Sequence, residues 1–198
     1  PTLCNVVSCS LIGYGLARFE FPGKKVILGI IIFSFVLPSQ ITMIPTYVLY
    51  SNMGILGTLW SFILPSILGM GINGPIFILI FYQFFKQVPK VLIEAAQIDG
   101  AGEWQIFRRI CLPLCKGCIC SAAILVFIDY WNMVEQPLIL LSDAETHPLS
   151  VFLSKINSGE IGLAFAVATI YMIPSLLVFL YGEEYLVDGI TYQGGIKG

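Results

Sequence analysis

Charged residues are scarce in this chain: Asp, Glu, Lys and Arg make up only 11% of its 198 residues, while 57% are hydrophobic. A water-soluble domain carries roughly a quarter charged residues, so the composition excludes an ordinary soluble protein. The formal net charge of −2 offers no basic surface for a nucleic acid. Short segments of alternating apolar and polar residues, typical of a membrane β-barrel, are also missing. The composition therefore predicts an all-α membrane protein, a polytopic helical bundle.

Residues that commonly carry out catalysis are few as well. The single histidine, His147, has no second metal ligand at a suitable spacing, and no nucleophile is paired with a base. We therefore predict no catalytic residue and no metal site, which disfavours an integral membrane enzyme. The sequence also lacks G-x4-G-K-[ST], the phosphate-binding loop of many ATPases. We expect no cofactor in this chain, which cannot itself be an ATPase of that kind.

The six cysteines do not follow the pattern of a secreted disulfide scaffold. Two of them lie in an apolar run near the start, and four form a C-x3-C-x2-C-x-C cluster: Cys111, Cys115, Cys118 and Cys120. The spacing of the first three resembles that of thiolates that hold an iron–sulfur cluster. However, nothing around them supplies a soluble cofactor domain. Packing as small hydrophobic side chains is the favoured interpretation.

Five apolar segments are each expected to form a membrane span or the end of one, because about 20 apolar residues cross the hydrocarbon core as a helix. They cover residues 1–17, 26–50, 64–85, 114–134 and 163–181. Pro38 and Pro45 are expected to kink the second span, and "GMGINGP" is a soft point in the third. The polar residues 135–162 are expected to form a loop with room for one short interfacial helix.

Basic residues indicate the orientation of these spans. If the connections alternate sides, nine of the ten basic residues fall on one face, and Lys155 alone lies opposite. This asymmetry predicts that the richer face is cytoplasmic. The nine are Arg18, Lys24, Lys25, Lys86, Lys90, Arg108, Arg109, Lys116 and, in the C-terminal tail, Lys197.

The most polar stretch, residues 86–113, has the pattern of a helical hairpin. Pro89 marks a helix start, Gly100 and Gly102 interrupt the helix, and "EWQIFRRICLP" resumes it. Ala95 and Ala96 would allow close approach to another surface, while Glu94 and Asp99 offer carboxylates to basic groups. The pattern fits a docking element for a soluble partner, and a helix lying on the membrane surface remains the alternative.

The same stretch carries a motif. Glu94-Ala95-Ala96, Gly100 and Ile110-x-Leu112-Pro113 match EAA-x3-G-x9-I-x-LP, so the chain resembles the permeases of importer-type ABC transporters. Further segments place the resemblance in the MalG-like carbohydrate branch and extend it over essentially the whole chain: "GYGLARFEFPGKK", "NMGILGT", "QVPKVLIEAAQIDGAG", "DYWNMVEQPLILLSD" and "GIKG". Glu20, at a position that is often basic, and the cysteine cluster depart from the family pattern.

The resemblance implies one transmembrane permease domain over residues 1–198, with about five spans here and six in the full protein. Because the chain starts at Pro1 without an initiator Met, we expect an upstream helix. Implied partners are a second homologous permease, a cytoplasmic ABC ATPase dimer that would bind ATP and Mg²⁺, an extracytoplasmic solute-binding protein and membrane lipid, but no nucleic acid. The implied location is the bacterial plasma membrane, with the hairpin and the C-terminus cytoplasmic. ATPase coupling is assigned to Glu94, Ala95, Ala96, Asp99, Gly100, Ile110, Leu112 and Pro113.

Polar residues inside the spans are candidates for a translocation path. Asp129 and Asn132, with Gln136 four residues further on, are expected to share one helix face. Asp129 would lie ~20 Å along the helix from Lys116, at a depth where an ionisable residue usually faces a bundle interior or a watery cavity. Asn73, at the soft point, is a fourth candidate. A structural hydrogen bond near the outer interface is the alternative role.

The sequence thus favours a permease subunit of an ATP-driven, binding-protein-dependent importer of sugars or oligosaccharides. An ABC importer permease for a non-carbohydrate solute is an alternative, because different importers share the coupling motif. A secondary transporter driven by an ion gradient through Asp129 is a further alternative, although it would leave the hairpin without a function. The sequence names no particular sugar.

Overall fold

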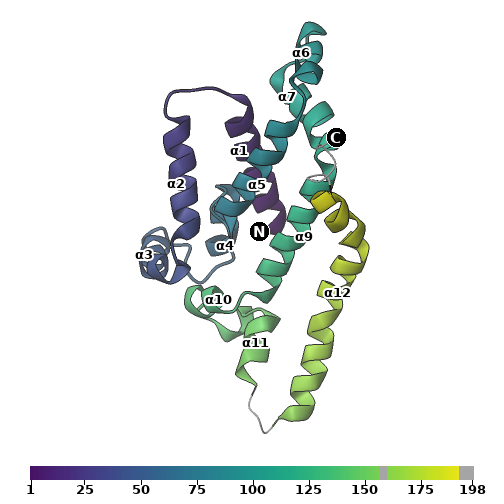
Figure 1. The fold of residues 1–198 in the computed structure, drawn as a ribbon. Coiled ribbons are helices and arrows are strands. Elements are labelled where there is room, and N and C mark those ends of the chain that lie inside the picture. The colour runs from purple at the N-terminus through teal and green to yellow at the C-terminus, as the bar shows by residue number, and fades with distance from the viewer. Residues whose placement is uncertain (157–159, 192–198) are drawn as a thin grey trace.

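The computed structural model describes residues 1–156 and 160–191. Within these ranges all regular structure is helical and no strand occurs, which confirms the expected fold class (Figure 1). The α-helices are α1 (Thr2–Arg18), α2 (Lys24–Val36), α3 (Ser39–Asn52), α4 (Trp60–Ile67), α5 (Gly74–Gln87), α6 (Lys90–Ile98), α7 (Glu103–Ile106), α8 (Leu112–Leu114), α9 (Lys116–Asn132), α10 (Glu135–Leu140), α11 (Leu149–Lys155) and α12 (Ile161–Thr191). A π-helix, η1 (Phe107–Cys111), precedes α8, and a 3₁₀ turn, η2 (Ala144–Thr146), precedes α11.

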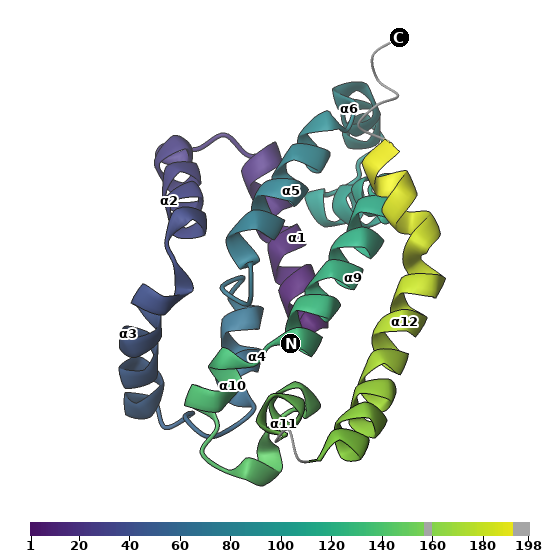
Figure 2. The same cartoon turned by 60° about the horizontal axis from the view of Figure 1, so that its bottom comes forward.

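Helices α1, α5 and α9 form the centre of the bundle, with α2 and α3 on one side and α12 on the other (Figures 1 and 2). Phe77, Phe81 and Phe85 recur every fourth residue along α5, so they form one buried stripe. This stripe packs in one cluster with Cys9 of α1 and Val126 of α9. By contrast, α12 contacts α9 along one side, and its most apolar stretch contains no buried residue.

Gly13 lies where α1 crosses α5. A Cβ atom at this position would meet the Cβ atom of Phe81 at 2.6 Å and the backbone nitrogen of Tyr82 at 2.9 Å. Small residues let membrane helices approach this closely. Because the contacted atoms belong to the backbone or lie next to it, no rotamer change of a neighbour would make room for a larger residue.

We expect Gly13→Val to separate α1 from α5 and to lower the thermal midpoint of the purified protein by about 2–12 °C, since overpacking costs roughly 1–3 kcal/mol and each kcal/mol shifts the midpoint of a chain of this size by about 2–4 °C. Gly15→Val is the matched control on the same helix, because nothing lies within 4 Å of its Cβ position. Thermal unfolding in detergent measures both variants. Equal midpoints would show that the crossing tolerates the larger side chain.

Several expected spans are broken rather than continuous. Residues 26–50 were expected to be one kinked helix, but α2 and α3 are separate helices that meet at 103°. Pro38 stands at this junction as the N-cap of α3, whereas α3 continues through Pro45. The span 64–85 is likewise divided, because α4 ends at Ile67 and α5 begins at Gly74. The kink expected in the second span is therefore a sharp corner, and the soft point in the third is a complete break.

The last apolar segment is the one helix within the described residues that is long and apolar enough to cross a membrane alone, over Ile161–Tyr185. The helix that contains this segment, α12, has 31 residues and is longer than the predicted span of 163–181. Three further bent pairs also pass that test when each pair is counted as one span. The predicted loop 135–162 is more ordered than expected, since it contains α10, η2 and α11.

Candidate coupling hairpin and translocation site

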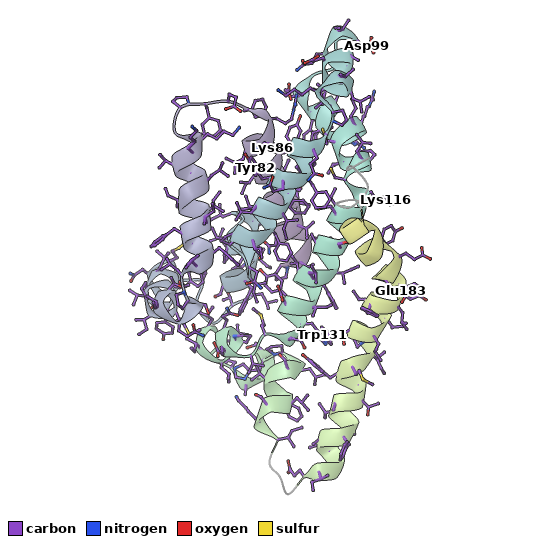
Figure 3. The ribbon with its side chains drawn as sticks, in the orientation of Figure 1. Tyr82, Lys86, Asp99, Lys116, Trp131 and Glu183 are labelled. Atoms are coloured by element: carbon purple, nitrogen blue, oxygen red, sulfur yellow. The ribbon has the colours of Figure 1, made fainter. Side chains whose placement is uncertain are left out.

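Helices α6 and α7 project from one end of the bundle, and Asp99 lies at the far tip of this projection (Figures 1 and 3). The chain leaves α5 through Pro89, whose extended backbone starts α6 at an angle of 71° to α5. It returns through η1 and α8 and enters α9 at a second bend of 79°. The hairpin predicted for residues 86–113 is therefore present as a protrusion between two spans.

The turn at the tip depends on Gly100. The amide of Ala101 donates to the carbonyl of Ala96 at 2.9 Å, and the amide of Gly100 donates to the carbonyl of Gln97 at 3.0 Å. This pair of bonds is the Schellman arrangement that ends a helix, and it places Gly100 at a φ of +79°, where glycine is favoured. Nothing lies within 4 Å of a Cβ atom at Gly100. Within this chain, glycine is therefore required by the backbone conformation and not by packing.

One side of the hairpin is anchored in the bundle. Ile93, Ile106, Phe107 and Cys111 are buried and belong to the same cluster as α1 and α5. A polar anchor at Glu103 was not predicted from the sequence. One of its carboxylate oxygens accepts a hydrogen bond from Tyr14 Oη at 2.9 Å, and the other accepts one from Gln97 Nε2 at 3.1 Å. Glu103 thereby connects α6 and α7 to α1.

The opposite side of the hairpin is exposed and strongly apolar. Val91, Ile98 and Trp104 have 73%, 87% and 63% of their surface accessible, and the Glu94 and Asp99 carboxylates are exposed beside them. Large exposed apolar patches bounded by polar groups mark interaction sites. Trp104 contacts Phe107 at a ring centroid distance of 5.5 Å, but most of the surface of this face is left uncovered by the described residues.

The eight residues assigned to coupling, seven of the motif and Asp99, divide between these two sides. Glu94, Ala95, Asp99 and Gly100 are exposed on the projecting half. Ala96, Ile110 and Leu112 pack in part against the buried cluster, and Pro113 is exposed in α8. The predicted motif therefore combines a surface at the tip with residues that hold the hairpin to the bundle.

Two of the predicted path residues, from different spans, are brought together. Asn73 caps the start of α5 with a left-handed backbone (φ 52°), and its Nδ2 donates to Asp129 Oδ2 of α9 at 2.7 Å. Asn73 is exposed and Asp129 is half-buried, so both remain accessible. The break between α4 and α5 thus presents an amide and a carboxylate side by side.

The expected common face with Gln136 is wrong. α9 ends at Asn132 and α10 starts at Glu135, so helical spacing does not extend from Asp129 to Gln136, which is half-buried on α10. Asn132 is engaged with α12, because its Oδ1 accepts a hydrogen bond from Tyr171 Oη at 2.6 Å. Of the four predicted path residues, Asn73 and Asp129 therefore lie together, Asn132 contacts α12, and Gln136 lies on a separate helix.

Trp131 belongs to the same contact between α9 and α12 (Figure 3). Its ring is stacked on Phe127 at a centroid distance of 5.7 Å and on Tyr171 at 5.6 Å. Its Nε1 donates to the carbonyl of Tyr171 at 3.1 Å, and Tyr171 Oη donates back to the carbonyl of Trp131 at 3.0 Å. Trp131 therefore packs the two helices together.

A buried polar network, not foreseen from the sequence, holds the break between α4 and α5. Tyr130 Oη lies 2.7 Å from Ser66 Oγ and accepts a hydrogen bond from the amide of Ile72 at 3.2 Å. From the other side, Asn5 Nδ2 donates to the carbonyl of Ile72 at 3.1 Å. Asn5 and Ser66 are fully buried. These bonds satisfy backbone groups that lack a helical partner and fix Asn73 opposite Asp129.

The cysteines of the 111–120 cluster are free thiols, and Cys111, Cys115 and Cys118 are buried. Across residues 1–156 and 160–191, no three His, Cys, Asp or Glu side chains converge as a metal site would require. Cys111, Cys115 and Cys118 instead belong to the central apolar cluster.

Comparisons with known proteins agree with this architecture. Arabinooligosaccharides transport system permease protein AraQ of Halalkalibacterium halodurans is 32% identical over 199 residues, covering 98% of this chain and 68% of AraQ. Lactose transport system permease protein LacG of Rhizobium radiobacter is 30% identical over 99% of this chain and 70% of LacG. The chain thus spans about two thirds of the length of these relatives.

A solved structure gives the same fold. The crystal structure of a bacterial ABC transporter involved in the import of the acidic polysaccharide alginate matches with a TM-score of 0.74 and 24% identity, covering 93% of this chain and 71% of that one. The sequence model of the family described as "Binding-protein-dependent transport system inner membrane component" matches residues 10–191. The chain therefore belongs to this family of transport permeases, which are membrane components and not enzymes.

Proposed function

We propose that this chain is a permease subunit of an ATP-driven importer of sugars or oligosaccharides, and that α6 docks on a separate cytoplasmic ATPase. The observation that carries the proposal is the projecting hairpin, on which the large apolar side chains Val91, Ile98 and Trp104 remain mostly exposed. Carbohydrate is supported as the cargo class by relatives named for arabinooligosaccharides, lactose and diacetylchitobiose. A solute-binding protein and a second, similar permease complete the proposed assembly.

The hairpin is built to transmit force. The Schellman turn at Gly100 fixes the angle between α6 and α7, and the Tyr14–Glu103 hydrogen bond connects that corner to α1. Movement of a docked ATPase would therefore move α1 and, through η1 and α8, α9. A ligand shifts an equilibrium between two conformations only if it binds one of them more tightly. ATP would therefore bind one arrangement of the ATPase more tightly, and the docked hairpin would then favour the permease conformation that fits this arrangement.

The exposed Asn73–Asp129 pair is the part of the proposed path that this chain supplies. The amide and the carboxylate offer donors and acceptors to sugar hydroxyls, and the α4–α5 break gives access to them at membrane depth. Broken membrane helices commonly build binding sites in transport proteins. In the structure Asn73 donates a hydrogen bond to Asp129 at 2.7 Å, so a bound sugar would replace that hydrogen bond.

The proposed orientation places the α6 end in the cytoplasm of a bacterial cell. Arg18 and Lys24 lie at the turn between α1 and α2, Lys86 lies at the end of α5 and Lys90 at the start of α6. A cytoplasmic excess of basic residues is the usual arrangement. Lys197 and the rest of residues 192–198 lie outside the described residues, so the side on which the tail lies stays a prediction.

Site-specific photocrosslinking of the assembled transporter tests the docking. A benzoylphenylalanine in place of Ile98, at the exposed tip, is expected to crosslink to the ATPase subunit, whereas the same group in place of Ile30 on exposed α2 should not. Uptake into proteoliposomes should require ATP inside and should persist when a protonophore or sodium ionophore is present. Crosslinking of Ile98 to lipid alone would contradict the docking proposal. Uptake that follows an ion gradient would instead indicate a secondary transporter.

A further inference from the structure

A pocket of about 540 Å³ opens between the α1–α2 turn and the junction of α5 with α6. Its walls are apolar at Phe21, Val26, Leu28, Phe85 and Val88. Five cationic side chains also line it: Arg18, Lys24, Lys25, Lys86 and Lys90. Half of the ten basic residues of the chain therefore gather around one cavity.

The charges in this pocket are far from balanced. Glu20 is the one acidic residue of its lining, and it pairs with Lys24 at 2.8 Å from the exposed surface. Lys24 lowers the pKa of Glu20, and Lys86 and Lys90 add to this effect. The other four cations form no ion pair in the described part of the chain. Four positive charges in one cavity repel each other until an anion is bound.

Arg18 and Lys86 indicate which kind of anion the pocket could bind. Arg18 is one of the residues that line the pocket, and its buried Nε atom has no hydrogen-bond partner. The Lys86 ammonium lies 5.6 Å from the centroid of the Tyr82 ring, on the turn of α5 that lines the pocket (Figure 3). Guanidinium and ammonium donors around one cavity are the groups that bind phosphate oxygens.

The surface that continues from the pocket is suited to lipid and not to a free ion. α2 begins at the pocket with Lys24 and has no buried residue along its length. Val26, Ile30 and Phe33 are exposed along this helix. A ligand with an anionic head in the pocket and apolar chains along α2 would match both surfaces. Basic pockets between membrane helices on the cytoplasmic side bind the headgroups of anionic lipids.

We propose that this pocket binds the phosphate headgroup of an anionic phospholipid, with its acyl chains along α2. The assignment depends on the pocket, on membership of the permease family and on the proposed cytoplasmic orientation of this end of the bundle. It requires neither the ATPase docking nor the sugar. Lys90 is the first residue of α6, so the headgroup would connect the α1–α2 turn to the base of the projecting hairpin. The bound lipid would also fix α2, which packs mainly against α5.

Native mass spectrometry of the assembled transporter, titrated with short-chain phosphatidylglycerol or phosphatidylcholine, tests the proposal. We expect phosphatidylglycerol to bind at least about tenfold more tightly. Arg18→Gln and Lys25→Gln should each weaken it about fivefold, because a basic residue near a membrane surface contributes ~1 kcal/mol to anionic-lipid binding. Lys116→Gln is the matched control, since Lys116 lies outside the pocket at the start of α9, 5.4 Å from the Tyr185 ring centroid.

Each outcome decides the question. Equal affinity for the two lipids, or an equal loss in Lys116→Gln, would overturn the pocket as a headgroup site. If millimolar inorganic phosphate displaces phosphatidylglycerol completely and stabilises the protein to the same degree, the pocket binds free anions and the lipid assignment fails. Lys25 is exposed, so Lys25→Gln should accumulate normally and can decide alone if Arg18→Gln does not fold. Photocrosslinking at Ile98 tests the ATPase docking separately, so failure of the lipid proposal and failure of the docking proposal can be told apart.

Discussion

Glu94→Lys is expected to reduce uptake at least about 100-fold while the chain remains in the membrane at its normal level. Glu94 is exposed on α6 and forms no hydrogen bond or ion pair within the described residues, so the reversal removes no contact of the fold. Its effect must therefore arise at the partner. Like charges brought together at an interface cost several kcal/mol, and about 2.8 kcal/mol corresponds to 100-fold.

The comparison with two further variants separates docking from insertion. Glu145→Lys reverses an exposed charge on η2, at the opposite end of the bundle from α6 (Figure 1), and it should leave ATPase association unchanged. Glu94→Gln keeps the size of the side chain and should lose less uptake than Glu94→Lys. Uptake, membrane abundance and copurification of the ATPase are measured for all three. Wild-type uptake and association in Glu94→Lys would remove Glu94 from the docking surface.

The hairpin could be predicted from the sequence because the residues that mark its helix ends and its motif lie close together in the chain. Pro89 caps the start of α6 and Gly100 forms the turn that follows its end, as the pattern indicated. The EAA spacing pointed to the family that the comparisons confirm. Local signals do not reveal which face is buried. Glu103, which sets the hairpin against Tyr14 of α1, is separated from that partner by 89 residues and carries no motif of its own.

The candidate path was predicted less completely for the same reason. Asn73 and Asp129 were each identified as polar residues at membrane depth, but their contact depends on how α5 packs against α9. Asn5, Ser66 and Tyr130, which hold the α4–α5 break, are isolated polar residues inside apolar segments. Gln136 was placed wrongly because nothing in its neighbourhood marks the end of α9 at Asn132. Helical spacing is reliable only within a helix whose end is known.

Two roles for Asp129, a contact with the sugar and a structural hydrogen bond with Asn73, can be separated by experiment. If the carboxylate contacts the sugar, Asp129→Ala should lower the uptake efficiency, kcat/KM, by about 10- to 100-fold, since truncating a hydrogen-bonded charged group costs ~1.5–3 kcal/mol. If the Asn73–Asp129 bond is only structural, the loss should appear in thermal stability instead. Asp129→Asn distinguishes the two, because an amide oxygen can still accept the 2.7 Å hydrogen bond from Asn73 but carries no charge.

Asn73→Gly completes this test, because glycine adopts the left-handed backbone at φ 52° without strain while the amide is lost. A translocation role predicts that Asn73→Gly and Asp129→Asn each raise KM for the sugar with little change in the thermal midpoint. Asn132→Ala serves as the control, since Asn132 is bonded to Tyr171 of α12 and should lose stability before it loses affinity. Unchanged KM in both path variants would assign the pair to the architecture of the break, and the sugar contacts would then have to come from the partner permease.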